Sequence, residues 1–393
     1  MTEENGKHAL RICLVGPAYP YRGGISHYNT SLARELTRRH DVHIVNYSRL
    51  YPAFLFPGKT QYDDSDSAMR IESARLIDSM NPFTWVRAGF HIVGFHPDAV
   101  IMQWWHPYFA PALFKVGQIL RMMRRGKVIF VCHNVVPHER SVLDRILSRL
   151  AFSVAHGFLV QSEEDRDNLL RLRRGAQVVV HPLPLFDFFK RGELTRQQAR
   201  ERFGGDSNPI ILFFGYIRPY KGLRYLLEAM PRIHERTGAR LMVVGEFYED
   251  DTPYRELVEE SGLQDTVTFV DRYVGNEEVE SYFMACDLVV LPYVSATQSG
   301  IVQISLSFDR PVVVTRVGGL PEVVVEGKTG FIVPPEDSRS LAGAVIRFFE
   351  EGWGEKMAPF FAEEKRRFSW SEVAASLMRL LEATGRKETR RIE

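Results

Sequence analysis

The chain has 393 residues, and its 50 Lys and Arg residues nearly balance 49 Asp and Glu residues, for a formal net charge of +1. This balance excludes a protein that attracts nucleic acid over its whole surface. The hydrophobic fraction of 45% is typical of a soluble globular protein, and the length predicts two or three domains. No apolar run reaches the roughly 18 residues needed to cross a bilayer.

The cysteines and the N-terminal segment indicate a cellular compartment. Cys13, Cys132 and Cys286 lie in or beside apolar runs without paired spacing, so we expect buried, reduced thiols rather than disulfides or metal ligands. Met1–Leu10 is polar and lacks the apolar core of a signal peptide. These features predict a cytoplasmic protein.

Apolar, strand-like runs alternate with helical patterns along the chain. The expected strands are 11–16, 43–47, 99–103, 128–132, 158–162, 177–182, 210–214, 241–245, 267–270, 288–291 and 312–315. Such alternation predicts an α/β protein with parallel sheets and right-handed crossovers. We therefore expect two doubly wound, Rossmann-like domains that face one another across a central cleft.

A polar stretch divides the two sets of strands. Residues 190–208 are rich in Arg, Glu, Gln and Gly, and we interpret them as a linker with a short helix. The expected organisation is an N-terminal domain (1–189), the linker (190–208) and a C-terminal domain (209–368). A last helix and tail (369–393) follow.

The most informative stretch is the turn from Gly215 to Gly222, between an apolar strand and a helix. Ligands of open α/β sheets bind outside the carboxyl ends of strands. The turn carries Arg218 and Lys221 beside a helix N-terminus, and two cations with free amides suit a diphosphate. Two solvated surface charges remain an equally good explanation of these residues alone.

Two further turns have the residues of an anion site. Gly23 and Gly24 open a helix, where glycine lets a backbone approach a ligand closely; a plain tight turn explains them as well. Thr297, Gln298, Ser299 and Gly300 precede another helix and predict an anion nest. Simple N-capping by Thr297 or Ser299 is the alternative.

Three segments in the N-terminal half of the chain each allow two interpretations. His133 follows a buried strand, ahead of a loop with Pro137, His138 and Glu139, and is either a cleft residue or a structural histidine. The basic run from Arg121 to Lys127 is either helix capping or a contact with an anionic lipid surface. The apolar loop from Arg49 to Gly58 either packs under its domain or meets an apolar partner.

Together these motifs resemble the family-4, or group 1, glycosyltransferases with the GT-B fold. The resemblance covers nearly the whole chain and is most specific in two segments, Gly215–Gly222 and Asp309–Gly330. Gly23-Gly24 and the His133 loop match two other landmarks of the family. Four landmarks in the family's order make the resemblance specific.

The resemblance implies roles for these residues. Arg218, Lys221, Gly23, Gly24 and Thr297–Gly300 would hold the diphosphate of a nucleotide sugar, Arg272 and Tyr273 the base, and His133 would lie beside the donor sugar. It also implies that the last helix, around Val373–Leu381, returns to the N-terminal domain. Such enzymes retain anomeric configuration and need neither metal nor cofactor, and this chain has no Asp-x-Asp pair at a predicted cleft-facing strand end.

One departure from the family pattern puts the donor in doubt. The family carries two glutamates eight positions apart, and the corresponding residues here are Ala296 and Ile304. The function predicted is hexosyl transfer from a nucleotide sugar to a polysaccharide, glycolipid or other glycoconjugate. A nucleotide-sugar epimerase and an inactive sugar-nucleotide-binding partner protein are the alternatives.

The expected partners are a nucleotide-sugar donor and a glycan or lipid-linked acceptor, but not nucleic acid. We expect acceptor specificity in the N-terminal loops Leu50–Phe56 and Trp104–Tyr108. A lipid-linked acceptor would add peripheral contact with the inner face of the membrane.

Overall fold

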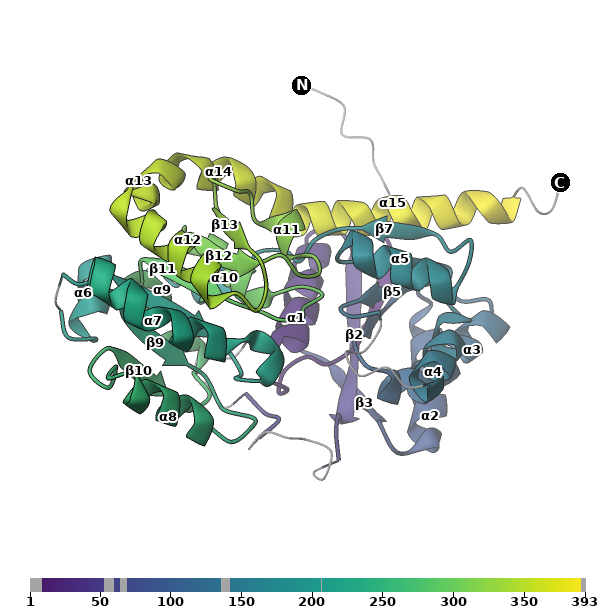
Figure 1. The fold of residues 1–393 in the computed structure, drawn as a ribbon. Coiled ribbons are helices and arrows are strands. Elements are labelled where there is room, and N and C mark those ends of the chain that lie inside the picture. The colour runs from purple at the N-terminus through teal and green to yellow at the C-terminus, as the bar shows by residue number, and fades with distance from the viewer. Residues whose placement is uncertain (1–8, 53–59, 64–68, 136–141, 206, 390–393) are drawn as a thin grey trace, which may run out of the picture. The chain divides into compact units, whose positions relative to one another are not determined.

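The structure is a computed structural model that describes residues 9–52, 60–63, 69–135, 142–205 and 207–389 (Figure 1). The predicted loop Leu50–Phe56 lies partly outside these residues, and Pro137–Glu139 lie wholly outside them. The chain folds into two compact units. The N-terminal unit takes the chain up to Asp63, then Ala68–His181, then everything from Trp370 onward; the C-terminal unit takes Pro182–Ser369.

The N-terminal unit is built on one parallel sheet of the strand order β3-β2-β1-β4-β5-β6-β7. Its strands are β1 (Arg11–Val15), β2 (Asp41–Arg49), β3 (Ala74–Asp78), β4 (Ala99–Trp104), β5 (Lys127–Cys132), β6 (Gly157–Val160) and β7 (Val178–Val180). Its helices are α1 (Gly24–Thr37), α2 (Pro82–Phe95), η2 (Pro107–Phe109), α3 (Ala110–Met122), α4 (Val142–Phe152), α5 (Glu163–Leu172) and α15 (Trp370–Thr389). Helix α15 packs beside α1, and α3 packs between α2 and α4.

The C-terminal unit has a second parallel sheet, of order β10-β9-β8-β11-β12-β13. Its strands are β8 (Ile210–Phe214), β9 (Arg240–Val244), β10 (Val267–Val270), β11 (Leu288–Leu291), β12 (Val312–Thr315) and β13 (Gly330–Val333). Its helices are η3 (Asp187–Phe189), α6 (Arg196–Glu201), η4 (Pro219–Lys221), α7 (Leu223–Thr237), α8 (Thr252–Glu260), α9 (Asn276–Ala285), α10 (Gly300–Ser307), α11 (Leu320–Val323), α12 (Ser338–Glu350), α13 (Trp353–Met357), η5 (Ala358–Phe360), α14 (Phe361–Glu364) and η6 (Lys365–Phe368). Helix α7 packs with α8 and α12, and α6 with α9.

Both sheets reverse their strand order at one place. In the N-terminal unit the chain runs outward in opposite directions from β1 and β4, and in the C-terminal unit from β8 and β11. At such a switch point the loops leave the two carboxyl ends on opposite faces of the sheet, so a crevice opens between them. The turn with Arg218 and Lys221 follows β8, and the Thr297–Gly300 turn follows β11.

The predicted fold class is confirmed, since all eleven expected strands are present in two parallel sheets. The sequence analysis missed β3 and β13. Each of them is an edge strand and therefore pairs with one neighbouring strand only. In β3 the side chain of Ile77 is buried, while its neighbours Leu76 and Asp78 are partly exposed. The pattern of β3 is therefore weak, whereas β13 is apolar with three of its four residues buried, but it is short and begins at Gly330, directly after a turn-rich loop.

The division between the units falls between His181 and Pro182, upstream of residues 190–208. That polar segment belongs to the C-terminal unit and is tied to it by charged contacts. Arg200 Nη1 lies 3.0 Å from Asp287 Oδ2, and the backbone N–H of Gly192 donates to Glu280 Oε1 at 2.7 Å. Its polarity therefore reflects a surface helix with ion pairs rather than a free connection.

The second exchange of chain between the units falls between Ser369 and Trp370, where α15 begins. Val373, Leu377 and Leu380 of α15 are buried within the N-terminal unit. A methyl group added at Gly157 of β6 would come within 2.9 Å of Leu380 Cδ1, so helix and strand touch at this glycine.

Leu380→Ala should lower the free energy of unfolding of the N-terminal unit by about 2–5 kcal/mol, because it opens a cavity between α15 and β6. Urea denaturation followed by circular dichroism measures this. Arg379→Ala, at an exposed neighbour, is the matched control and should change stability by less than about 0.5 kcal/mol. Equal effects of the two substitutions would contradict the packing described.

Candidate functional site

The turn after β8 is shaped by its glycines. Gly222 has φ of +67°, and an added Cβ would lie 2.0 Å from the carbonyl oxygen of Pro292, in the loop after β11. The N–H of Gly215 donates to Val244 O at 2.9 Å, and that of Ile217 to Glu246 O at 3.0 Å. The turn is therefore held on one side by the β9 end and on the other by the β11 end.

Lys221 is the most unusual side chain of this turn. Only 8% of its surface is exposed, and its Nζ lies 5.7 Å from the ring centre of Tyr293. Among the residues that the structure describes, no carboxylate pairs with it. Burial and, second, the nearby Arg218 guanidinium lower the pKa of Lys221 from 10.5 to about 8. Burying an ammonium group without a counter-charge costs desolvation free energy, which a bound anion would offset.

Within the part of the chain that the structure describes, the Arg218 side chain contacts an aromatic ring and no carboxylate. Its Cζ lies 4.8 Å from the ring centre of Tyr248, and the Tyr248 ring is tilted against Tyr216 with ring centres 4.6 Å apart. A cation over an aromatic face is oriented without being neutralised. The guanidinium therefore keeps its charge for a further anionic partner.

The start of α10 lies next to Lys221. An added Cβ on Gly215 would be 3.0 Å from Lys221 Nζ and 3.3 Å from Ile301 Cδ1, so both side chains border the same point. Ser299 is the N-cap residue, but its hydroxyl does not cap the helix; it lies 3.3 Å from Tyr293 OH. The first turn of α10 therefore has no side-chain cap, and N-capping does not account for Ser299.

The structure thus brings together Arg218, Lys221 and the turn of Thr297, Gln298, Ser299 and Gly300. The carbonyl oxygen of Thr297 accepts from the N–H of Gly319 at 2.9 Å, which fixes the turn from a third loop. Sequence analysis missed Tyr293, whose ring faces Lys221 and whose hydroxyl meets Ser299. Its position two residues after β11, at the switch point, was the available signal.

Ala296 and Ile304, which replace the family's two glutamates, are 8% and 5% exposed and belong to the hydrophobic core of the C-terminal unit. Neither provides a polar group at this place. Arg272 and Tyr273 lie in the loop after β10, where Arg272 Nη1 donates to Glu278 Oε1 at 2.7 Å. The Arg272 charge is therefore already met by a carboxylate from the first turn of α9.

Gly23 and Gly24 begin α1 in the N-terminal unit. Gly23 has φ of +104°, a conformation that favours glycine, whereas Gly24 is helical. An added Cβ at either position would meet nothing within 4 Å. The space over this helix start is open within the unit.

His133 is held by a chain of buried amides. Its Nε2 lies 2.7 Å from Gln103 Oε1, and its Nδ1 lies 2.9 Å from Gln161 Nε2. Gln103 Nε2 in turn donates to Asn29 Oδ1 at 3.1 Å, and Asn29 Nδ2 donates to the carbonyl oxygen of Pro17 at 3.1 Å. Gln103, Gln161 and Asn29 are at most 1% exposed. The sequence analysis did not single out any of these three.

This chain of hydrogen bonds determines the state of the imidazole. Because Gln103 uses its amide nitrogen for Asn29, its oxygen must accept, so His133 Nε2 carries the proton. Gln161 donates to Nδ1, which must then be unprotonated. Burial lowers the pKa of His133 from 6.5 to about 3, and the Tyr28 ring of α1 packs edge-on at 4.7 Å. His133 is neutral, and both of its nitrogens are occupied.

Gln161→Glu tests this assignment. A carboxylate 2.9 Å from Nδ1 favours the imidazolium, so the pKa of His133 should rise by at least 1 unit. NMR of the histidine ring protons, with the His133 signal assigned through its loss in His133→Asn, would measure it. Gln161→Met is the uncharged control and should leave the ring neutral. A His133 that already titrates between pH 5 and 8 in the unchanged protein would refute the network.

Two negative observations complete the site. Within the described residues, no group of three or more His, Cys, Asp or Glu side chains is arranged to hold a metal ion. None of the described helices combines the length and the hydropathy that a membrane crossing requires.

Comparisons with known proteins identify the family of this chain. Residues 22–184 match the family model described as Glycosyltransferase Family 4, and residues 208–351 match the one described as Glycosyl transferases group 1. The D-inositol 3-phosphate glycosyltransferase of Corynebacterium glutamicum is 26% identical, over 68% of this chain and 69% of the relative. The alpha-D-kanosaminyltransferase of Streptomyces kanamyceticus is 30% identical, over 52% of this chain and 53% of the relative, so the match spans about half of that protein.

Solved structures share the whole fold at low identity. The sucrose-phosphate synthase of Thermosynechococcus elongatus superposes with a TM-score of 0.70 at 19% identity, covering 95% of this chain and 98% of that one. The HepE protein of Anabaena, solved in complex with UDP, gives a TM-score of 0.73 at 16% identity, covering 95% and 100%. With a family model matched in each half and the GT-B fold over nearly its full length, the chain belongs to the group 1, or family 4, glycosyltransferases.

Proposed function

We propose that this protein transfers a hexosyl unit from a nucleoside-diphosphate sugar to a glycan, glycolipid or other glycoconjugate acceptor, with retention of anomeric configuration. The observation that carries the proposal is Lys221, a buried ammonium that no carboxylate of the described residues neutralises. It lies beside the start of α10, which has no side-chain cap, at the β8/β11 switch point. HepE, which shares the fold, was solved with UDP and with UDP-glucose. This supports a uridine nucleotide as the first donor to test.

The proposed chemistry is stabilisation of the leaving group. As the bond between the sugar and the diphosphate breaks, negative charge grows on the phosphate oxygens. Lys221, Arg218 and the free amides of α10 meet that charge within a site of low polarity, where such contacts are strongest. Gly23 and Gly24 would add backbone amides from the start of α1. The leaving phosphate takes the proton of the acceptor hydroxyl, so no protein base is needed.

His133 would then act as an uncharged group beside the donor sugar. Its neutral ring, with both nitrogens hydrogen bonded, neither accepts nor gives a proton in the proposed reaction. Arg272 and Tyr273 are proposed to lie next to the nucleotide base, with Arg272 held by Glu278. Trp104 of the predicted acceptor loop is the last residue of β4 and is fully buried, so only the following residues, Trp105–Tyr108, are proposed to face the acceptor. A cytoplasmic location is part of the same proposal, since nucleotide sugars would be taken from that compartment.

Nucleoside diphosphate release from UDP-glucose and a panel of other nucleotide sugars tests the proposal. Lys221→Ala and Arg218→Ala should each lower kcat by about 10²–10³, the usual loss for one electrostatic donor. Arg232→Ala, an exposed cation on α7, is the control and should be unaffected. Turnover should survive EDTA, because protein cations carry the charge. Loss of turnover in EDTA together with an active Lys221→Ala variant would refute the assignment.

The affinity for the bare nucleoside diphosphate should depend on pH. The pKa of Lys221 in the free protein is about 8, so Lys221 loses its proton as pH rises through 8. Affinity should fall between pH 7 and 9, by up to about tenfold per pH unit above 8, since a bound anion favours the charged form. Calorimetry measures this, and Lys221→Arg should abolish the dependence. A flat profile in the unchanged protein would count against Lys221 as a phosphate ligand.

Gly24→Ala separates binding from folding. The new methyl group meets no protein atom within 4 Å and lies in the first turn of a helix, so stability should be unchanged or raised by up to about 1 kcal/mol. If a diphosphate approaches the backbone here, affinity for it should nevertheless fall at least tenfold. Gly343→Ala, in α12 with equally open surroundings, is the matched control. Normal affinity in Gly24→Ala would remove Gly24 from the site.

A further inference from the structure

Two histidines of the N-terminal unit meet at the amino edge of its sheet. His43 is the third residue of β2, and His91 lies near the end of α2. Their Nε2 atoms are 2.9 Å apart and their ring centres 5.1 Å apart, and the His43 ring also lies 5.2 Å from the ring of Phe95. One Nε2–H donates and the other Nε2 accepts, so the two nitrogens point toward one another.

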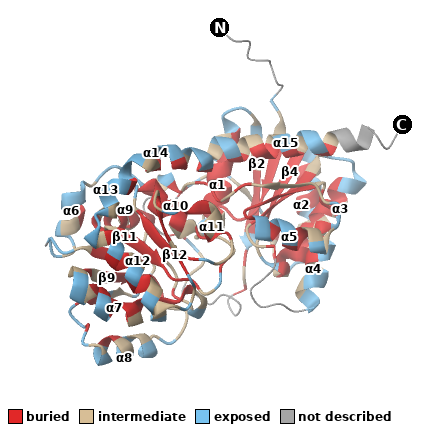
Figure 2. Ribbon diagram, turned by 45° about the horizontal axis from the view of Figure 1, so that its top comes forward, coloured by how far each residue is buried: buried red, intermediate tan, exposed pale blue. Residues whose placement is uncertain are grey.

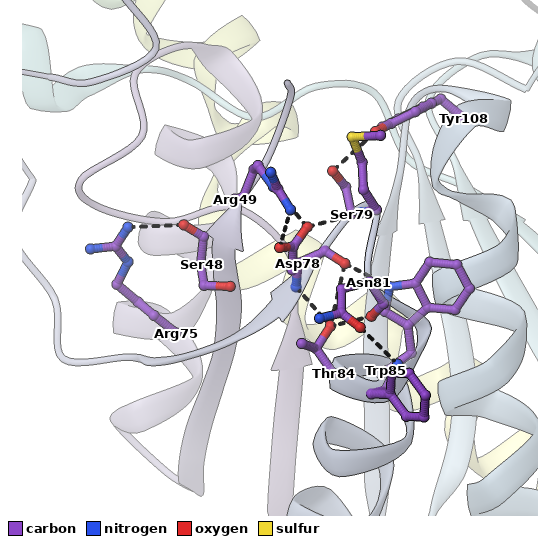
Figure 3. Close-up of polar contacts among 11 residues, drawn as sticks. Ser48, Arg49, Arg75, Asp78, Ser79, Asn81, Thr84, Trp85 and Tyr108 are labelled. Atoms are coloured by element: carbon purple, nitrogen blue, oxygen red, sulfur yellow. Dashed lines mark hydrogen bonds and ion pairs between the residues drawn. The ribbon is translucent and has the colours of Figure 1, made fainter. Parts of the chain in front are cut away.

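The helix that carries His91 is fastened to the sheet at its other end. Trp85 Nε1, in the first turn of α2, donates to the carbonyl oxygen of Asp78 at 2.7 Å, and the Asp78 carboxylate is paired with Arg49 of β2 (Figure 3). From this carboxyl edge α2 leads back to the start of β4. The end of α2 therefore meets the beginning of β2, and both rings stand on regular elements rather than on loops.

Charged neighbours of His43 suit a neutral ring with a cation beside it. Burial and, second, the neighbouring His91 lower the pKa of His43 below its usual 6.5, so its ring is neutral at pH 7. The carboxylates of Asp41 and Glu72 act on His43 in the opposite direction and would favour a bound cation. Arg11 offsets part of that effect, since its Nε lies 3.3 Å from Asp41 Oδ2.

The spacing of the two rings matches that of two imidazoles on one metal ion. With Zn–N bonds of about 2.0–2.1 Å and a tetrahedral angle, two ligand nitrogens lie about 3.3 Å apart and their ring centres about 5.2 Å apart. The ring centres of His43 and His91 already have a separation of 5.1 Å. A pivot of the rings that parts the nitrogens from 2.9 Å by about 0.4 Å would bring both lone pairs onto one ion.

The pair is also accessible from solvent. His91 is exposed and His43 is partly exposed, and Figure 2 shows that exposed residues lie on the helices and loops around the buried strands. A hydrated ion can therefore reach both nitrogens. Within the described part of the chain, no group of three or more His, Cys, Asp or Glu side chains is arranged around a metal position, so water would complete the coordination.

The chemistry of the ligands selects the kind of ion. Imidazole nitrogen suits Zn²⁺, Ni²⁺ and Cu²⁺, whereas Mg²⁺ and Ca²⁺ prefer oxygen ligands. We propose that His43 and His91 form a two-histidine site for such a transition-metal ion, which joins the start of β2 to the end of α2. The site stabilises the edge of the sheet and lies at the opposite end of the strands from the His133 loop. This inference goes beyond the proposed transfer reaction and does not depend on it.

Zinc binding by the whole chain, without an affinity tag, tests the proposal. At a Zn²⁺ concentration of about 100 times the dissociation constant, which calorimetry measures, the N-terminal unit should melt about 5–10 °C higher. The same concentration of Mg²⁺ should produce no shift. His43→Asn and His91→Asn should each weaken zinc binding about tenfold or more, since even the loss of a residue that only orients a ligand costs that much.

His96→Asn is the matched control. His96 is an exposed histidine at the end of the same helix, and its φ of +54° suits asparagine, so this variant should bind zinc as the unchanged protein does. Electron paramagnetic resonance of bound Cu²⁺ should detect two coordinated nitrogens in the unchanged protein and one in His91→Asn. Undiminished binding in His91→Asn, an equal loss in His96→Asn or an equal shift with Mg²⁺ would overturn the proposal. So would the absence of any shift with Zn²⁺, which would leave a plain hydrogen bond between the rings.

Discussion

The chemistry of the C-terminal unit depends on the parallel pairing of β8 with β11. These two strands are neighbours in the sheet, although 73 residues separate their ends at Phe214 and Leu288 in the chain. Because the strands are parallel, the turns that follow them leave the same edge, and because the strand order reverses here, they leave on opposite faces. That geometry places Lys221 and the start of α10 at one point, with Tyr293 between them.

The free energy that is needed to bury the Lys221 charge supports its interpretation as a residue that binds an anionic substrate. A stable surface lysine would keep its ordinary pKa, and a structural lysine would have a carboxylate partner. Lys221 has neither property: it is buried, its pKa is lowered to about 8, and Arg218 repels it. Evolution seldom retains an unpaired buried charge without use, because removal of the charge would stabilise the free protein. A site that becomes favourable only with an anion present fits a substrate-binding role.

In the N-terminal unit, a hydrogen-bond network determines the orientation and the tautomer of His133. The chain from Pro17 through Asn29, Gln103 and His133 to Gln161 joins α1 and β4 to the loops after β1, β5 and β6, and the amides of Asn29 and Gln103 each have a partner on either side. Such a network specifies one orientation and one tautomer of the ring. A histidine that is neutral and fully hydrogen bonded is suited to shape and orientation. It is not suited to proton transfer near neutral pH.

Local sequence patterns determined the elements, and tertiary contacts determined the site. Apolar runs such as Ile210–Phe214 are buried on both faces of a parallel sheet, so their pattern predicted eleven strands, the fold class and the turn with Arg218 and Lys221. Strand β3 was missed because only Ile77 of its five residues is buried, and β13 was missed because it is a four-residue strand that directly follows a turn-rich loop. The polar stretch 190–208 resembled a linker because ion pairs to distant residues such as Asp287 cannot be read from local composition.

The side-chain partners could not be predicted for the same physical reason. That Gln103 and Gln161 occupy both nitrogens of His133, and that Tyr293 joins Lys221 to Ser299, depends on strand neighbours far apart in the chain. Sequence alone therefore determined which residues are chemically capable, and the tertiary structure decided which of them meet and in what state of charge.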